Sequence, residues 1–205
     1  MRLIFARHGQ SEANVLRLMS NRDLPHGLTT LGREQATRLA VSVAAEKPVA
    51  LYCSPILRAV QTAEIVGAAC KLRPIRADGL REPDCGVLEG LGDPASWKVH
   101  DSVVATWVAG DESARPPGGE SLLEVRARFE GFMRLLLATR EVRQGPVAIV
   151  AHGSLLGNLL PRICNNLPLD AAARYGLPNA ESIVITGSGV PFTCESWAGT
   201  RPHNV

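Results

Sequence analysis

The sequence predicts an α/β fold of three layers, in which helices flank a mostly parallel central sheet. Short apolar runs alternate along the chain with longer segments whose apolar residues recur at helical spacing. This alternation is typical of parallel sheets that are covered by helices. Two of the apolar runs end in a His-Gly pair, His8-Gly9 and His152-Gly153, and Arg7 precedes the first pair. Because ligands of open α/β sheets bind beyond the carboxyl ends of the strands, these residues mark the candidate site.

Six strands are predicted from apolar runs that are bounded by glycine, proline or polar residues. They are residues 3–5, 49–53, 73–75, 147–151, 181–186 and 190–196. A polar loop over residues 10–25 follows the first strand, and the glycine-rich turn 187–189 joins the last two. The tail from Trp197 onward is expected to fray.

The first two long helices carry signals at their N-termini. Thr29 or Thr30 can cap the first helix. Its apolar face is expected to consist of Leu31, Leu39, Ala40 and Val43. For the second helix, Ser54 fits the N-cap and Pro55 fits the first helical position. Arg58 therefore falls in the first helical turn, close to the strand ends.

A later long helix opens with a capping box formed by Ser121 and Glu124. Its core-facing residues are expected to be Leu122, Val125, Phe129, Phe132, Met133 and Leu136. Its solvated face is expected to carry the basic residues Arg126, Arg128 and Arg134. The helix that follows His152 is expected to be interrupted by Pro161.

At 205 residues the chain can bury a sizeable core, and we expect a single domain over residues 1–205. Residues 80–90 are rich in glycine and flanked by prolines, which argues against regular structure there. Residues 91–120 read as an insertion, with a helical stretch over 94–108 followed by a loop. We expect this insertion to act as a small lid over the site.

The composition argues against several classes of protein. The net charge of +2, with a sequence pI of about 8.4, is too mild and too dispersed to indicate a nucleic-acid partner. No apolar run approaches the length of a membrane span, and no leader precedes the first strand. The five cysteines are odd in number, widely spaced and free of Cys-x-x-Cys pairs. Reduced thiols and a cytoplasmic location are therefore predicted, rather than disulfides or a metal site.

Residues suited to binding a phosphoryl group follow four successive strands. Arg7 and His8 follow the first strand, Arg58 the second, Glu82 the third and His152 the fourth. A parallel sheet brings these strand ends to one edge. Arginine offers a planar fork that matches phosphate, and histidine can be a neutral nucleophile because its reference pKa is about 6.5. Two Arg, two His and a Glu around one point suit a phosphomonoester, whose charge spreads over three oxygens in the transition state.

These motifs resemble those of the histidine phosphatase superfamily, also called the phosphoglycerate mutase-like family. The resemblance rests on Arg7-His8-Gly9, on Arg58 in an Arg-x-x-x-Thr-Ala string, on the loop Glu-x-x-x-Gly-x-x-Glu-Gly that begins at Glu82, and on His152-Gly153. It implies a phosphoglycerate mutase-like fold and a histidine acid-type phosphatase, a phosphoric monoester hydrolase. Such an enzyme acts on small phosphorylated metabolites through a phosphohistidine intermediate, and the resemblance implies no metal or other cofactor.

The resemblance also implies a role for each site residue. His8 would attack phosphorus, and Glu82 would protonate the leaving alkoxide and then deprotonate the attacking water. The phosphate oxygens would be bound by Arg7, Arg58 and His152, with Asn14 and Gly153 as further contacts.

Other hypotheses remain open at this stage. His8, His152 and Glu82 could form a two-His-one-carboxylate metal site, although the arginines beside them would repel a cation. A 2,3-bisphosphoglycerate-dependent phosphoglycerate mutase would use the same five residues, but such mutases usually carry a longer insertion than residues 91–120. An inactive interaction module would usually have lost the nucleophile or an arginine. Beyond a small phosphate ester, the sequence names no substrate, and a homodimer is one option for the oligomeric state.

Overall fold

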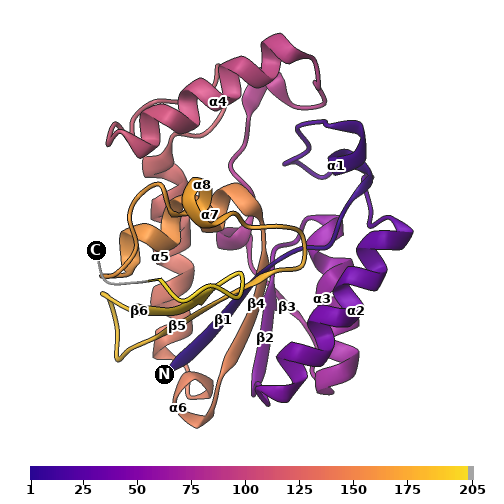
Figure 1. Ribbon diagram of the computed structural model, residues 1–205, viewed down its shortest axis with the longest axis vertical. Helices are drawn as coiled ribbons and strands as arrows, with labels where there is room; N and C mark the ends of the chain where they lie inside the picture. Colours follow the sequence, from indigo (N-terminus) through magenta and orange to yellow (C-terminus); the bar gives the residue numbers. More distant parts are fainter. Residues whose placement is uncertain (203–205) are drawn as a thin grey trace.

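The computed structural model describes residues 1–202, which form a six-stranded sheet in the order β3-β2-β4-β1-β5-β6 (Figure 1). The strands are β1 (Arg2–Arg7), β2 (Ala50–Cys53), β3 (Ile75–Arg76), β4 (Val147–Ala151), β5 (Ser182–Thr186) and β6 (Thr193–Trp197). The pairs β1–β4, β4–β2 and β2–β3 are parallel, whereas β1–β5 and β5–β6 are antiparallel. The predicted α/β fold with a mostly parallel sheet is confirmed.

Helices cover both faces of this sheet, with α2 and α3 on one face and α5 and α7 on the other (Figure 1). The helices are α1 (Glu12–Leu16), α2 (Thr30–Ala45), α3 (Leu57–Cys70), α4 (Pro94–Val108), α5 (Leu122–Ala138), α6 (Glu141–Gln144), α7 (Gly153–Ile163) and α8 (Ala171–Tyr175). Two short 3₁₀ turns, η1 (Asp78–Leu80) and η2 (Gly86–Leu88), lie before α4. Unlike the other long helices, α4 lies beyond one end of the sheet (Figure 1).

The central strands are apolar throughout because both of their faces are buried. On β4, Val147, Ile149 and Ala151 belong to the cluster under α5 and α7, while Ala148 and Val150 belong to the cluster under α2 and α3. Side chains of a strand alternate between the two faces, so a strand buried on both sides reads as a continuous apolar run. This arrangement explains why β4 could be recognised from composition alone.

The predicted helix starts are right for α2 and α5 but not for α3. Thr29 caps α2, although Leu31 of the expected apolar face is exposed. The N-cap of α3 is Ile56 and not Ser54, and Arg58 still lies in the first turn. The Ser54 hydroxyl instead bonds the ring of His152 at 2.7 Å, which draws it toward the site.

Three further expectations are wrong, and for two of them the reason is a contact between residues that are far apart in the sequence. Arg128 is half-buried and not solvated, because its guanidinium binds backbone carbonyls of a neighbouring loop. The helix α7 continues through Pro161 and ends two residues later, so the proline removes only a bond of the last turn. Trp197 ends β6, is fully buried, and donates its indole N–H to the carbonyl of Gly176. Residues 203–205 of the predicted frayed tail lie outside the described residues.

The capping box and the core face predicted for α5 are confirmed, and all six core-facing residues are buried. The polar loop after β1, by contrast, contains the short helix α1, which the sequence analysis missed. Ser11 and Asn14 form a capping box that begins it. The short strand β3 begins at Ile75, and β6 begins at Thr193, later than expected.

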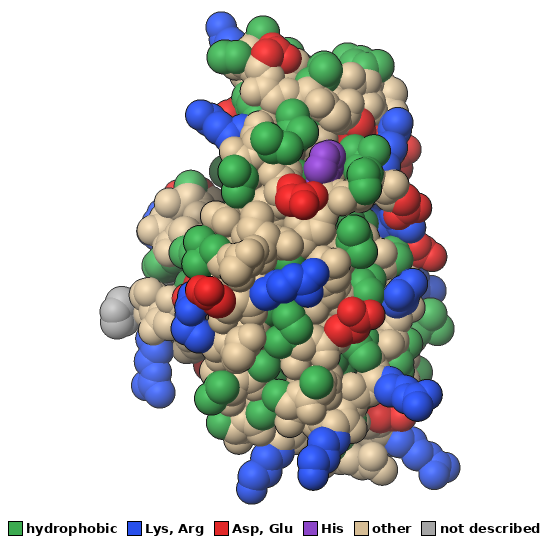
Figure 2. Space-filling view, turned by 90° about the vertical axis from the view of Figure 1, so that its right-hand side faces the viewer, with side chains coloured by type: hydrophobic (Ala, Val, Ile, Leu, Met, Phe, Trp, Pro, Cys, Tyr) green, Lys and Arg blue, Asp and Glu red, His purple; other side chains and the backbone are tan. Residues whose placement is uncertain are grey.

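On the face shown in Figure 2, basic, acidic and hydrophobic side chains are interspersed. This dispersal agrees with the small net charge of +2. Among residues 1–202, no helix is both long enough and apolar enough to cross a bilayer.

Candidate active site

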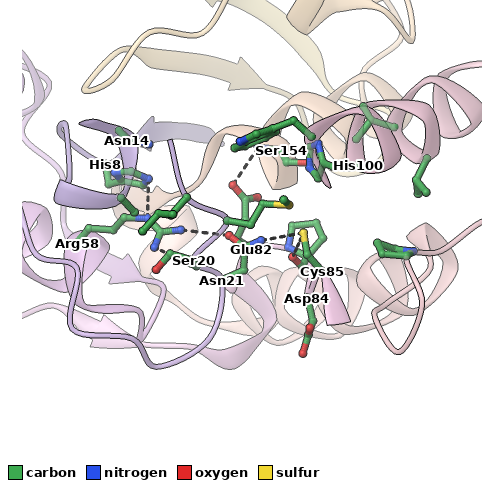
Figure 3. Close-up of a pocket in the computed structure, with 18 of the residues that line it drawn as sticks. His8, Asn14, Ser20, Asn21, Arg58, Glu82, Asp84, Cys85, His100 and Ser154 are labelled. Atoms are coloured by element: carbon green, nitrogen blue, oxygen red, sulfur yellow. Dashed lines mark hydrogen bonds between the residues drawn. The ribbon is translucent and has the colours of Figure 1, made fainter. Parts of the chain in front are cut away.

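A cavity lies at the carboxyl edge of the sheet, between the ends of the parallel strands and α4 (Figure 3). On the sheet side it is lined by Arg7, His8, Asn14, Arg58 and Glu82. On the opposite side α4 contributes Trp97, His100, Val103, Val104 and Trp107. The structure therefore brings five of the seven residues proposed from the sequence to one cavity, and the other two lie directly behind it.

His8 is held in one orientation by hydrogen bonds to both ring nitrogens. Its Nδ1 lies 2.7 Å from the carbonyl oxygen of Gly9, and the Nε of Arg58 donates to its Nε2 at 2.9 Å. A carbonyl oxygen can only accept, so the proton of the neutral ring sits on Nδ1. The lone pair of Nε2 is therefore directed at Arg58 and the cavity, where an incoming phosphoryl group would lie.

Burial keeps both histidines of the site neutral. The pKa of His8 lies well below its usual range because the ring is removed from water and because Arg58 and Arg7 repel a positive charge. The pKa of His152 also lies well below its usual range, chiefly because its ring is removed from water and further because of repulsion from Arg58 and from His8. A neutral imidazole is the form that can act as a nucleophile.

Within residues 1–202, Arg7 and Arg58 are the two Lys or Arg side chains that line the cavity, and Arg58 is buried while Arg7 is half-buried. Burial lowers the pKa of each guanidinium, although arginine remains protonated in proteins. Arg7 donates to the carbonyl of Leu177 at 2.6 Å, and its Nε, which is buried, has no partner among the described residues. Arg58 donates to the backbone carbonyl of Ser20 as well as to His8. Each guanidinium thus keeps donor capacity for an anion.

The Glu82 carboxylate sits at the N-terminus of α7. Its Oε1 accepts from the backbone N–H of Leu155 at 2.6 Å, and its Oε2 accepts from that of Ser154 at 3.2 Å. These N–H groups belong to the first turn of the helix, where they lack intrahelical partners and attract negative charge. The contact fixes the carboxylate between the His8 end of the cavity and His100 of α4 (Figure 3).

The backbone around Glu82 is held by Arg128 of α5. Its guanidinium donates to the carbonyls of Gly79, Arg81 and Glu82. The same guanidinium pairs with Glu120, whose carboxylate also accepts from the N–H of Asp84. Arg128 and Glu120 thereby hold the chain on both sides of Glu82.

His152 lies behind His8 and does not line the cavity. The two rings are 5.2 Å apart between centroids, in an edge-on arrangement. The Nε2 of His152 is 2.7 Å from the Ser54 hydroxyl, and its Nδ1 has no partner among the described residues. Gly153 also lies outside the lining. A Cβ on Gly153 would come within 3.2 Å of the Arg7 Nε, so its lack of a side chain leaves room for that arginine.

Asn14 lines the cavity and is oriented by its neighbours. Its side-chain oxygen accepts from the N–H of Ser11 and from the amide of Asn179. The amide nitrogen of Asn14 is therefore the group that can donate to a ligand. Asn179 also donates to the backbone carbonyl of His8, so it links Asn14 to the backbone of His8.

The residues that hold the site in place could not be recognised from the sequence. Ser54 fits a helix cap, and Asn179, Leu177 and Ser154 carry no pattern that ties them to the site. The Ser-x-x-Asn spacing of α1 is the one available signal, because Ser11 and Asn14 form a capping box. Across residues 1–202, no three His, Cys, Asp or Glu side chains lie close enough together to hold a metal ion.

Comparison with known proteins agrees with this geometry. The protein named probable phosphoglycerate mutase of Proteus mirabilis is 31% identical over 198 residues, which span 96% of this chain and 90% of that protein. A mycobacterial glucosyl-3-phosphoglycerate phosphatase, solved with VO3, superposes with a TM-score of 0.80 at 28% identity, over 97% of this chain and 99% of the other. The alpha-ribazole phosphatase of Shigella flexneri superposes with a TM-score of 0.76 at 25% identity, over 100% and 96% of the two chains. A family model matches residues 3–200, so the chain belongs to the histidine phosphatase superfamily, branch 1.

Proposed function

We propose that the protein hydrolyses phosphate monoesters of small metabolites through a phosphohistidine on His8. The observation that carries the proposal is the neutral His8 ring, whose Nε2 is free of a proton and faces Arg58 at 2.9 Å. A nucleophile whose Nε2 carries no proton thus lies beside two cations that can bind an anion.

In the first step, the Nε2 lone pair of His8 attacks phosphorus while the bond from phosphorus to the ester oxygen breaks. The leaving oxygen takes a proton from Glu82, which acts as the general acid of this step. Water then attacks the phosphohistidine and gives its proton back to Glu82, so inorganic phosphate leaves and His8 is regenerated. Arg7, Arg58 and the amide of Asn14 hold the phosphate oxygens during both steps.

His152 acts on this reaction from behind His8. In the present arrangement its Nε2 is engaged by Ser54, and its ring packs edge-on against that of the nucleophile. We infer that His152 positions His8 and can reach a phosphate oxygen only after its side chain shifts. Gly153 leaves space for Arg7, and its amide lies at the start of α7, where anions are favoured.

A mutase is the second candidate, because a relative at 31% identity carries that name. A mutase must retain a bisphosphorylated intermediate and exclude water from the phosphohistidine. Among the described residues that line the cavity, the Lys and Arg side chains are Arg7 and Arg58, and both are at the His8 end. Lys98 and Arg115 of the segment 91–120 are exposed and do not line it. A second phosphate would therefore have no Lys or Arg partner away from the His8 end, which favours hydrolysis.

The finer assignments follow from the same site. We infer that residues 91–120 act as a lid within a single domain, since α4 forms the outer wall of the cavity. The acid-type assignment is supported by the lowered pKa of His8, which keeps the nucleophile neutral in mildly acidic solution. The cytoplasmic location and the oligomeric state stay predictions.

The test supplies 3-phosphoglycerate with a trace of 2,3-bisphosphoglycerate, and in parallel an activated aryl phosphate. We expect free phosphate from the aryl ester, inhibition by vanadate as a mimic of five-coordinate phosphorus, and full activity after exhaustive chelation. Rapid conversion of 3-phosphoglycerate to 2-phosphoglycerate with little free phosphate would establish the mutase instead. Loss of activity with a chelator, restored by a divalent cation, would support the metal hypothesis.

A further inference from the structure

We propose that the leaving group accepted by this site is uncharged and apolar, so that the substrates are phosphate monoesters of alkyl alcohols or phenols. The inference rests on the proposed phosphatase function and specifies its substrate class. It is carried by one side of the cavity, here called the apolar wall. The apolar wall consists of Leu18, Met19, Trp97, Val103, Val104 and Trp107.

The apolar wall lies where a leaving group would be directed. In Figure 3, His8 and Arg58 are at one end of the cavity, Glu82 is in the middle, and His100 of α4 lies on the far side of Glu82 from His8. In phosphoryl transfer the leaving oxygen lies roughly in line with the nucleophile, on the far side of phosphorus. A phosphate attacked by His8 therefore points its leaving group past Glu82 and toward α4.

Hydrogen bonds fix the two aromatic residues of the apolar wall. The indole N–H of Trp97 donates to the carbonyl of Arg17 at 2.7 Å, and that of Trp107 donates to the carbonyl of Ala114 at 2.7 Å. Arg162 of α7 pins the end of α4 by donating to the Trp107 carbonyl. With their polar atoms satisfied internally, neither indole has an unpaired donor. Trp97 is half-buried and offers carbon surface to a ligand, whereas Trp107 is almost fully buried and supports the wall, which is formed before a ligand binds.

The charges around the apolar wall argue against an anionic leaving group. Asp84 is the carboxylate that lines the cavity besides Glu82, and it is paired with Arg22. The titratable group that α4 adds to the lining is His100, whose Nδ1 lies 3.0 Å from the carboxylate of Asp101. A carboxylate or a second phosphate on the leaving group would lose water against this wall without a Lys or Arg partner, and the His100 ring beside it is already engaged by Asp101.

An apolar leaving group gains binding free energy at the apolar wall, whereas an anionic one loses it. Leu18, Trp97, Val103 and Val104 are only half-buried in the free protein. A ligand that covers their carbon surface removes apolar area from water on both partners. The wall therefore selects by hydrophobic burial, while Arg7 and Arg58 supply the binding of the phosphate.

The experiment measures kcat/KM for a series of n-alkyl phosphates from ethyl to hexyl, whose leaving groups have nearly equal basicity. We expect kcat/KM to rise with each methylene, by up to about fourfold per group. The kcat/KM of hexyl phosphate should exceed that of an ester of the same length that ends in a carboxylate by at least about tenfold, because removing one charge from water costs more free energy than this factor represents. 3-Phosphoglycerate should be a poorer substrate than both.

Two matched substitutions on α4 localise the effect. Val104→Asp places a charge on the apolar wall and should flatten the dependence on chain length, whereas Val104→Ala should reduce it in part. Val99→Asp places the same charge on an exposed valine of the same helix, outside the lining, and should leave the dependence intact. If the unsubstituted protein hydrolyses the esters but kcat/KM does not depend on chain length, or if it prefers the carboxylate ester, the inference is overturned while the proposed function stands. Failure to hydrolyse any monoester would overturn the proposed function and the inference with it.

Discussion

The Nε of Arg58 donates to the Nε2 of His8 at 2.9 Å, and both side chains are almost fully buried. The cation therefore contacts the atom that is proposed to attack phosphorus. It lowers the pKa of His8, after burial itself, and it is placed to bind an oxygen of the same phosphoryl group. This contact thus adds to burial in keeping the nucleophile neutral, and we propose that it also positions the substrate.

Replacing this arginine should weaken both effects. For Arg58→Gln we expect kcat/KM to fall by roughly 100- to 1,000-fold, the range for loss of one transition-state donor. The acid limb of the pH profile should also move to higher pH, because removal of the positive charge raises the pKa of His8. Arg33→Gln, at an exposed arginine of α2, is the matched control. A loss below about tenfold with an unmoved acid limb would remove Arg58 from this role.

The two buried histidines predict how stability depends on pH. Their pKa values in the folded protein lie well below the unfolded value of about 6.5, chiefly because of burial. As pH falls below about 6.5, the unfolded chain takes up protons that the folded chain does not, so the free energy of unfolding decreases. The slope for two such groups is at most about 2.7 kcal/mol per pH unit.

Urea denaturation at pH 7.5, 6.5 and 5.5 checks this slope before the carboxylates begin to titrate. The protein should be least stable at pH 5.5. His152→Gln should remove about half of the pH dependence of the free energy of unfolding, irrespective of its effect on stability at pH 7.5. Equal stability at pH 7.5 and 5.5 in the unsubstituted protein would show that the histidines are not buried as neutral rings.

Glu82 is predicted to matter most for poor leaving groups. General acid catalysis contributes roughly 100- to 10,000-fold, and an activated aryl oxygen needs little of it. Glu82→Gln should therefore slow an alkyl ester far more than 4-nitrophenyl phosphate. Arg128→Met, which releases the carbonyls beside Glu82, should show the same bias to a smaller extent. Glu130→Gln on the exposed face of α5 serves as the control, and equal losses on both esters would exclude Glu82 as the acid.

Gly9 is required by a close approach of two backbones. A Cβ at this position would lie 2.3 Å from the carbonyl oxygen of Gly32. Gly9→Ala should lower the free energy of unfolding by about 1–3 kcal/mol or more, the range for overpacking. Gly131→Ala in α5 meets nothing within 4 Å and should be stabilising by up to about 1 kcal/mol. Thermal denaturation of both variants distinguishes a required glycine from a replaceable one.

His8, Arg58 and His152 could be proposed as site residues from the sequence because each comes directly after a recognisable strand or lies in the first turn of a helix. His8 follows β1, and Arg58 lies in the first turn of α3. Their supports could not be predicted, because the bonds join distant parts of the chain: Ser54 and His152 are 98 residues apart, and Leu177 and Arg7 are 170 apart. Local patterns carry no information about such pairs.

Arg128 shows the same limit for a helix face. Arg128 falls on the polar face of the helical period, so a solvent-exposed side chain is predicted. In the structure a loop packs against that face, and its backbone carbonyls accept hydrogen bonds from Arg128. Trp197 was assigned to a frayed tail because it lies near the chain end, yet its ring fills the core beside Tyr175. In both cases the environment is set by tertiary packing and not by the local sequence.

The central claim, that His8 carries the phosphoryl group, is tested most directly by trapping the intermediate. The protein is mixed with a ³²P-labelled monoester, quenched in base and digested, since phosphohistidine is stable in base and labile in acid. We expect base-stable, acid-labile label on the peptide that contains His8, and none in His8→Ala, while His152→Ala retains label at a lower level. Equal label in His8→Ala, or label on another residue of the unsubstituted protein, would contradict the account.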